Sequence, residues 1–299
     1  MSSTVLYGLV VILWGTSWLG ISMQLGAVEP EVSVAYRFSI AALILLAWCF
    51  WRRLPMRFGL RVHGLMFLMG LCLFSLNYIG FYFAIDNIVS GLSAVAYSTI
   101  VIMNIMFGAM FLREPIRPRV VVGAIIGMIG ITLVFWKDVS VIGIISAGMI
   151  GLGWSLLATM SASFGNIISL AIQRMKVPVV QANAYGMCYG GLVTFVIVYT
   201  RGLPFEFVWT VKYVGSLLYL AFFSSVLGFT FYLTLLGRIG ADRAAYASVL
   251  FPVVALSFST VFEEYDWTVL SLAGVVVVLI GNLLVLTRLD SATVVRPSV

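Results

Sequence analysis

Charged residues are scarce in this chain of 299 residues: they make up 9% of it, against about a quarter in soluble domains. Hydrophobic residues account for 62%. A soluble fold of this length cannot cover so much apolar surface, because surface area does not shrink fast enough as a chain grows. The composition excludes an ordinary soluble domain and predicts a protein embedded in a lipid bilayer.

Motifs of common cofactors and reactions are missing too. No Gly-rich phosphate loop followed by Lys-Ser/Thr is present, which argues against ATP as the direct driver of any process. His63 is the only histidine, and no His/Cys cluster has metal-ligand spacing. The three cysteines, Cys49, Cys72 and Cys188, lie in apolar segments and suit packing better than disulfide formation. We expect neither an enzyme nor a cofactor or metal site.

Long apolar runs dominate what is present. A bilayer core of about 30 Å takes about 20 apolar residues per crossing, and continuous runs of this kind predict helices rather than barrel strands. The first run is too long for a cleaved signal peptide. The predicted spans are 4–25, 31–51, 62–84, 90–112, 118–136, 144–172, 179–200, 212–236, 243–262 and 268–288. The sequence thus predicts an all-α membrane protein with ten transmembrane helices.

The distribution of Lys and Arg predicts the orientation. With the N-terminus in the cytoplasm, basic residues gather in cytoplasmic loops, for example at Arg52-Arg53, while the opposite side holds only Lys137, Arg201 and Lys212. Both termini are therefore expected in the cytoplasm of an inner-membrane protein. The net charge of +6 reflects this rule. We expect the lipid bilayer, and not nucleic acid, as the partner.

A weak internal repeat divides the chain. A shift of 150 residues places Ser75 on Ser225 and Phe81-Tyr82 on Phe231-Tyr232. Five spans per half is an odd number, so the second half must enter the membrane from the opposite side. Residues 1–138 and 139–290 are the predicted halves, and 291–299 form a cytoplasmic tail. Inverted repeats of this kind are typical of alternating-access carriers, with the substrate site in a central cavity between the halves.

Several of these residues resemble a known family. Trp14-Gly15, Arg37-Phe38 and Phe111-Leu112-Arg113-Glu114-Pro115, with Tyr232 through Glu264 as a second copy, resemble the EamA family of the drug/metabolite transporter superfamily. The second copy lacks the usual proline after Glu264. Within the family the chain looks most like the YddG-type amino-acid exporters. The resemblance implies export of amino acids and related small metabolites.

Neutral polar and aromatic side chains at mid-span depth are the candidates for the substrate site. An unpaired polar group is costly in lipid, so these faces should point inward, where aromatic walls with scattered hydroxyls and amides suit a small amphipathic solute. Interfacial belts and helix–helix hydrogen bonds are the competing explanations. The candidates are Trp14, Ser17, Trp18, Asn77, Tyr78, Tyr82, Tyr97, Trp154, Ser155, Asn166, Tyr232, Tyr246 and Ser248.

Two further residues stand out within the spans. Arg37 could snorkel outward, brace neighbouring carbonyls or meet a substrate carboxylate. Pro252 removes a backbone hydrogen bond in mid-helix and is the predicted hinge. No acidic residue lies near a helix centre, which favours facilitated diffusion or exchange over proton coupling.

The sequence thus predicts a monomeric exporter of amino acids and related metabolites, working by alternating access. Two alternatives remain open. An exchanger of drugs, cations or nucleotide-sugar-like solutes would use the same fold, although fixed negative charge on the solute calls for more deep Lys or Arg. A membrane sensor would need a signalling domain, and the loops are short.

Overall fold

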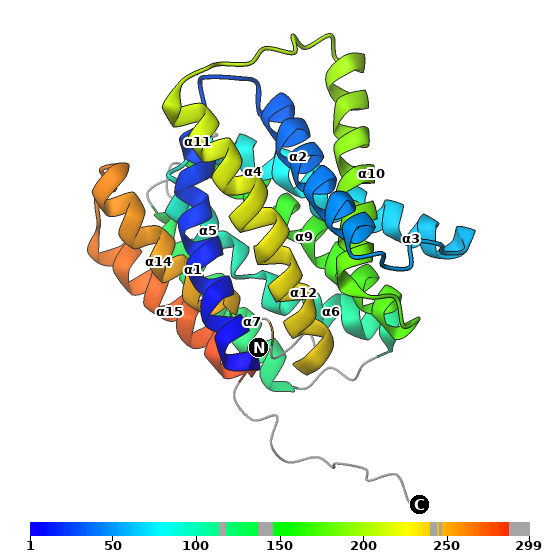
Figure 1. The fold of residues 1–299 in the computed structure, drawn as a ribbon. Helices are drawn as coiled ribbons and strands as arrows, with labels where there is room; N and C mark the ends of the chain where they lie inside the picture. Colours follow the sequence, from blue (N-terminus) through cyan, green and yellow to red (C-terminus); the bar gives the residue numbers. More distant parts are fainter. Residues whose placement is uncertain (114–117, 137–145, 240–243, 245–246, 287–299) are drawn as a thin grey trace, which may run out of the picture.

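The computed structural model is all-helical over the residues it describes, which are 1–113, 118–136, 146–239, 244 and 247–286. Figure 1 shows the helices as one bundle of roughly aligned rods. Helical elements are α1 (Ser3–Ser22), α2 (Pro30–Trp51), α3 (Leu60–Leu71), η1 (Cys72–Leu76), α4 (Asn77–Ile85), α5 (Ser90–Tyr97), α6 (Ile100–Leu112), α7 (Pro118–Val134), α9 (Ala147–Arg174), α10 (Val179–Thr200), α11 (Val211–Tyr219), η2 (Leu220–Gly228), α12 (Phe229–Ile239), α14 (Ala247–Phe262) and α15 (Val269–Leu286).

The ten predicted spans are confirmed. Within the described residues, seven segments are long and apolar enough to cross a membrane, and three shorter apolar helices add to them. The seven are Ser3–Ser22, Pro30–Trp51, Leu60–Ile85, Ser90–Leu112, Ala147–Arg174, Val179–Thr200 and Val211–Ile239. The shorter three are Val121–Val134, Leu250–Phe262 and Val269–Gly281.

Backbone conformation repeats between the two halves. The six described residues with positive φ form three pairs about 150 residues apart: Gly26 with Lys176, Arg53 with Gly202, and Arg113 with Glu264. All six follow a helix end, where a left-handed residue commonly stops the helix. Two π-helical segments recur as well, because η1 shifted by 150 residues falls inside η2. The repeat that is faint in the sequence is clear in the backbone.

Equivalent helices of the two halves pack against each other. The pairs are α7 with α15 and α2 with α10, and each pair lies side by side in Figure 1. Glycines allow α7 and α15 to approach closely. A Cβ on Gly130 would lie 2.6 Å from the backbone N of Val278, and a Cβ on Gly281 would lie 2.7 Å from the backbone N of Gly127. Because residue numbers run in opposite directions along this contact, the two equivalent helices are antiparallel. Small residues allow such backbone approach in a membrane bundle.

Three spans are less regular than their sequences suggest. The third and eighth contain η1 and η2, and the fourth is interrupted at Ser98 and Thr99 between α5 and α6. The hydroxyls of Ser98 and Thr99 donate to the carbonyls of Val95 and Ala96, at 2.6 and 2.7 Å. Side-chain bonds of this kind compete with helical ones. Irregular turns of this type concentrate at functional sites.

Candidate functional site

An aromatic cavity lies at the centre of the bundle, between α1, η1, α4, α5 and α12. Its lining consists of Trp14, Ser17, Trp18, Ile21, Leu73, Asn77, Tyr78, Phe81, Tyr97 and Phe229. The rings contact one another closely; Trp18 lies 5.0 Å from Phe81 and 6.0 Å from Tyr97 between centroids. The volume is about 30 Å³, and a single water needs about 10–15 Å³ on this scale, so the cavity holds a few waters at most. In this conformation the cavity is too narrow for an organic solute, which can enter only if the helices move apart.

Trp14 connects this cavity to the second half of the chain. Its indole N–H donates to the carbonyl of Ser224 at 3.2 Å, and its ring lies 4.7 Å from the ring of Tyr232. Gly228 makes room for the indole, since a Cβ there would meet Nε1 at 2.5 Å. Trp14 therefore bridges α1 to η2 and α12 rather than to its own half.

Asn166 and Tyr232 belong to a polar cluster next to the aromatic cavity. The amide of Asn166 donates to the Tyr232 hydroxyl at 3.3 Å and to Oδ1 of Asn104 at 3.4 Å. Ser163 donates to the same Asn104 oxygen at 2.8 Å. All four are buried, so their hydrogen bonds replace water that the membrane interior cannot supply. The cluster joins α6, α9 and α12.

Ser155 and Tyr82 are buried but do not line the cavity. The hydroxyl of Ser155 lies 2.8 Å from that of Ser93 and so ties α9 to α5. Tyr82 donates to the side chain of Gln24, beyond the end of α1. Both contacts hold spans together around the cavity.

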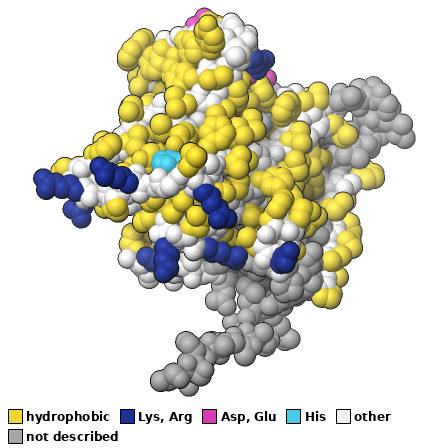
Figure 2. All heavy atoms as spheres, turned by 90° about the vertical axis from the view of Figure 1, so that its right-hand side faces the viewer, with side chains coloured by type: hydrophobic (Ala, Val, Ile, Leu, Met, Phe, Trp, Pro, Cys, Tyr) yellow, Lys and Arg dark blue, Asp and Glu magenta, His cyan; other side chains and the backbone are white. Residues whose placement is uncertain are grey.

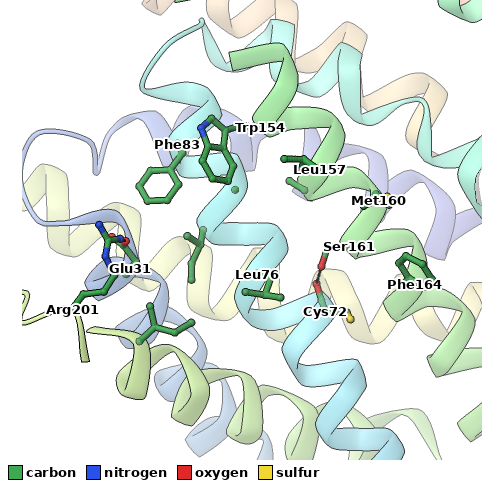
Figure 3. A pocket seen from close by; sticks show the side chains of 14 residues that line it. Glu31, Cys72, Leu76, Phe83, Trp154, Leu157, Met160, Ser161, Phe164 and Arg201 are labelled. Carbon is green, nitrogen blue, oxygen red and sulfur yellow. Dashed lines mark hydrogen bonds and ion pairs between the residues drawn. The ribbon is translucent and has the colours of Figure 1, made fainter. Parts of the chain in front are cut away.

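Trp154 lies apart from the other candidates. It is 39% exposed and lines a separate groove of about 510 Å³ on the outside of α4 and α9. Figure 3 shows its ring beside that of Phe83 above this groove, whose lining is otherwise mostly apolar. The sequence predicts that Trp154 faces the substrate cavity, but α9 turns its side chain outward. Tyr246 and the side chain of Ser248 lie outside the described residues; Pro252 lies within α14.

Arg37 is the polar residue whose position the sequence left most open. Its side chain is fully buried, so outward snorkelling is wrong. Nε donates to Ser225 Oγ at 2.8 Å and Nη2 to Ser224 Oγ at 3.1 Å. The guanidinium carbon lies 4.2 Å from the ring centroid of Tyr78. Sequence reasoning did not include Arg37 in the site, although its place in the first half of a long apolar run was a signal.

Comparison with known proteins agrees with this architecture. A sequence model described as "EamA-like transporter family" matches residues 2–136 and 149–287. The protein PagO of Salmonella typhimurium is 24% identical over 96% of this chain and 93% of its own length. A probable amino-acid metabolite efflux pump of Escherichia coli is 26% identical over 91% of both chains, and the uncharacterized transporter YoaV of Bacillus subtilis is 23% identical. One solved crystal structure superposes with a TM-score of 0.68 at 16% identity, covering 95% of this chain and 96% of that one, and shows the fold.

Proposed function

Because this chain belongs to the EamA-like transporter family, we propose that it exports amino acids and related small metabolites from the cytoplasm by alternating access. It is a multi-pass membrane transporter of this type, and the family argues for transport rather than catalysis. The substrate class, the direction and the mechanism are the proposal. One observation carries it: residues of both halves line a narrow aromatic cavity among buried side chains.

The closed cavity supports alternating access. Trp14 of the first half and Phe229 of the second share the wall, and their ring centroids lie 5.0 Å apart. A volume of about 30 Å³ is too small for an amino acid, so binding requires the two halves to move apart. The equivalent helices α7 and α15 pack antiparallel, as expected for two halves that face opposite sides of the membrane. The same kind of movement between the halves can therefore open the cavity to either side.

The cavity chemistry supports a small amphipathic solute. Rings form most of the wall, while Ser17, Asn77 and the hydroxyls of Tyr78 and Tyr97 offer neutral hydrogen-bonding groups. Such walls fit the apolar side chain of an amino acid, with a few polar groups to orient its head. The relatives described as probable amino-acid metabolite efflux pumps, each 26% identical to this chain, agree with that chemistry.

The charge distribution supports cytoplasmic termini. On the face drawn in Figure 2, most Lys and Arg side chains lie in the lower half and the visible acidic side chains lie near the top. Among the described basic residues, Arg53 follows the end of α2, Arg61 lies in the first turn of α3 and Lys176 follows the end of α9. Cytoplasmic loops are rich in such residues. We place the N-terminus, and with it the proposed 291–299 tail, on the cytoplasmic side.

Counterflow into proteoliposomes tests the proposed function. Vesicles loaded with one unlabelled solute are given the same solute in labelled form, with no pH gradient, and the panel includes neutral, basic, acidic and aromatic amino acids, a cationic drug and a nucleotide sugar. We expect labelled neutral and aromatic amino acids to accumulate transiently. Counterflow of the drug or the nucleotide sugar alone contradicts the substrate class, and a strict need for a pH gradient contradicts facilitated exchange. An absence of counterflow for every amino acid contradicts the proposed substrate class.

A further inference from the structure

The guanidinium of Arg37 is a buried cation in which one nitrogen makes no hydrogen bond. Two of its nitrogens bind Ser225 and Ser224, but Nη1 has no hydrogen-bond partner although it is fully buried. An arginine stays charged at any physiological pH. Leaving a charged donor unpaired in a membrane interior is costly, so the vacancy calls for an explanation.

Among the residues that the structure describes, no carboxylate contacts Arg37. Glu31, the acid on the same helix, is only 1% exposed and pairs with Arg201, as Figure 3 shows at the rim of the outer groove. Glu263, directly after the end of α14, accepts hydrogen bonds from Ser90. The groups around Arg37 are neutral: the hydroxyls of Ser224 and Ser225, the faces of the Tyr78 and Phe38 rings, and the Tyr82 side chain nearby. Its positive charge is available to an anion.

The guanidinium lies directly behind the wall of the central cavity. Tyr78 is the shared element, because its ring carries the guanidinium on one side and lines the cavity as well. The serines that hold Arg37 belong to η2, and the carbonyl of Ser224 is the acceptor for Trp14, another wall residue. A movement of Tyr78 or of the π-helical segment η2 therefore opens a direct path between Nη1 and the cavity.

An unpaired acceptor lies on the same wall. Oδ1 of Asn77 is buried without a hydrogen-bond partner, and Asn77 lines the cavity next to Tyr78 in the chain. A free cationic nitrogen therefore lies against the ring of Tyr78, and a free amide oxygen belongs to the residue that precedes it. A carboxylate satisfies the donor and an ammonium group satisfies the acceptor, and an amino acid carries both.

We propose that Arg37 is a specificity-determining residue that binds the carboxylate of the transported solute, while Asn77 accepts a hydrogen bond from its amino group. The inference rests on the proposed transport of amino acids and adds a requirement for the carboxylate. A purely structural Arg37 would tie α2 to η2 without discriminating between solutes. The two roles differ in what they do to solute preference.

The test is a preference ratio measured by counterflow. L-Phenylalanine and phenethylamine share the aromatic ring, but only the amino acid has a carboxylate. We expect the wild type to transport phenylalanine at least tenfold faster than phenethylamine, and Arg37→Gln to lower this ratio to about one. Arg37→Lys keeps the charge without the guanidinium fork and should restore part of the preference. A ratio does not depend on how much active protein each vesicle holds.

Several outcomes overturn the inference. A wild-type ratio near one does so without any variant, which covers the case in which Arg37→Gln fails to fold. An unchanged high ratio in Arg37→Gln overturns it while leaving amino-acid transport in place. If the wild type transports no amino acid at all, the proposed function fails and this inference with it.

Discussion

The carboxylate of Glu263 caps the first turn of α5, accepting hydrogen bonds from the backbone N–H of Ser90 at 2.9 Å and from its hydroxyl at 3.0 Å. Ser259, one turn earlier, accepts from the N–H of Gly91 at 2.8 Å. A helix N-terminus favours a negative partner. Because α5 and α14 belong to opposite halves, this cap fastens the two halves at the end of the bundle that we place outside the cell.

Removing this cap should open that end of the transporter. We expect Glu263→Ala to speed external labelling of a cysteine introduced at Asn77, in a cysteine-free background, by about tenfold or more, since charge-assisted hydrogen bonds contribute about 1.5–3 kcal/mol. A membrane-impermeant maleimide measures the rate. Glu264→Ala is the matched control, because Glu264 is the adjacent acid and is exposed. Equal labelling rates in Glu263→Ala and Glu264→Ala would show that the Glu263 cap does not hold this end of the transporter closed.

Variants of two tryptophans distinguish the central cavity, which Trp14 lines, from the outer groove, which Trp154 lines, as the substrate site. Trp14→Phe removes the hydrogen bond to Ser224 and part of the cavity wall, so we expect transport to fall roughly tenfold, the effect of losing 1–2 kcal/mol at a binding site. Trp154→Phe makes the same chemical change in the outer groove and should leave transport within about twofold. Initial counterflow rates at matched reconstitution measure both. A larger loss of transport in Trp154→Phe than in Trp14→Phe would indicate that the substrate binds in the outer groove.

Close packing of α7 on α15 should make Gly130, Gly274 and Gly281 intolerant of a side chain. Gly281→Ala places a Cβ within 2.8 Å of the backbone of Gly127 and Gly123, and backbone cannot yield as a flexible side chain can. We expect a loss of about 1–3 kcal/mol, seen as a lower melting temperature in detergent. Gly153→Ala, which meets nothing within 4 Å, is the control and should not destabilise the protein. Equal melting temperatures would contradict this contact.

Helix-end conformation predicts opposite effects at equivalent positions of the two halves. Gly26 has φ of 73° and its counterpart Lys176 has φ of 61°. A left-handed residue with a Cβ costs about 1 kcal/mol. Gly26→Ala should therefore lower the melting temperature and Lys176→Gly should raise it. Thermal unfolding of the purified protein followed by fluorescence measures both, and a rise for Gly26→Ala would contradict the assignment.

Pro252 should act on transport more than on stability. It lies inside α14, where its ring removes the bond to the carbonyl of Ser248. Pro252→Ala should keep expression and lower transport, because a restored helical bond stiffens the proposed hinge. Expression is read by gel filtration and transport by counterflow. Unchanged transport would count against the hinge.

The sequence alone determined the number and type of the spans. Runs such as 31–51 and 179–200 are long and apolar, and only helices satisfy their backbone groups in lipid. It also predicted the two-half organisation and the cavity residues of the first span, because Trp14, Ser17 and Trp18 recur at helical spacing. These features follow from local composition and period.

Only the tertiary structure decided which side chains share a cavity. Trp14 and Trp154 look alike by depth and neighbours, yet helix rotation points one into the bundle and the other outward. The π-helical segment η2 and the position of Arg37 depend on contacts between residues almost 190 positions apart, such as Arg37 with Ser225. Hydropathy reports depth in the membrane, whereas rotation about a helix axis is set by packing against helices from the other half.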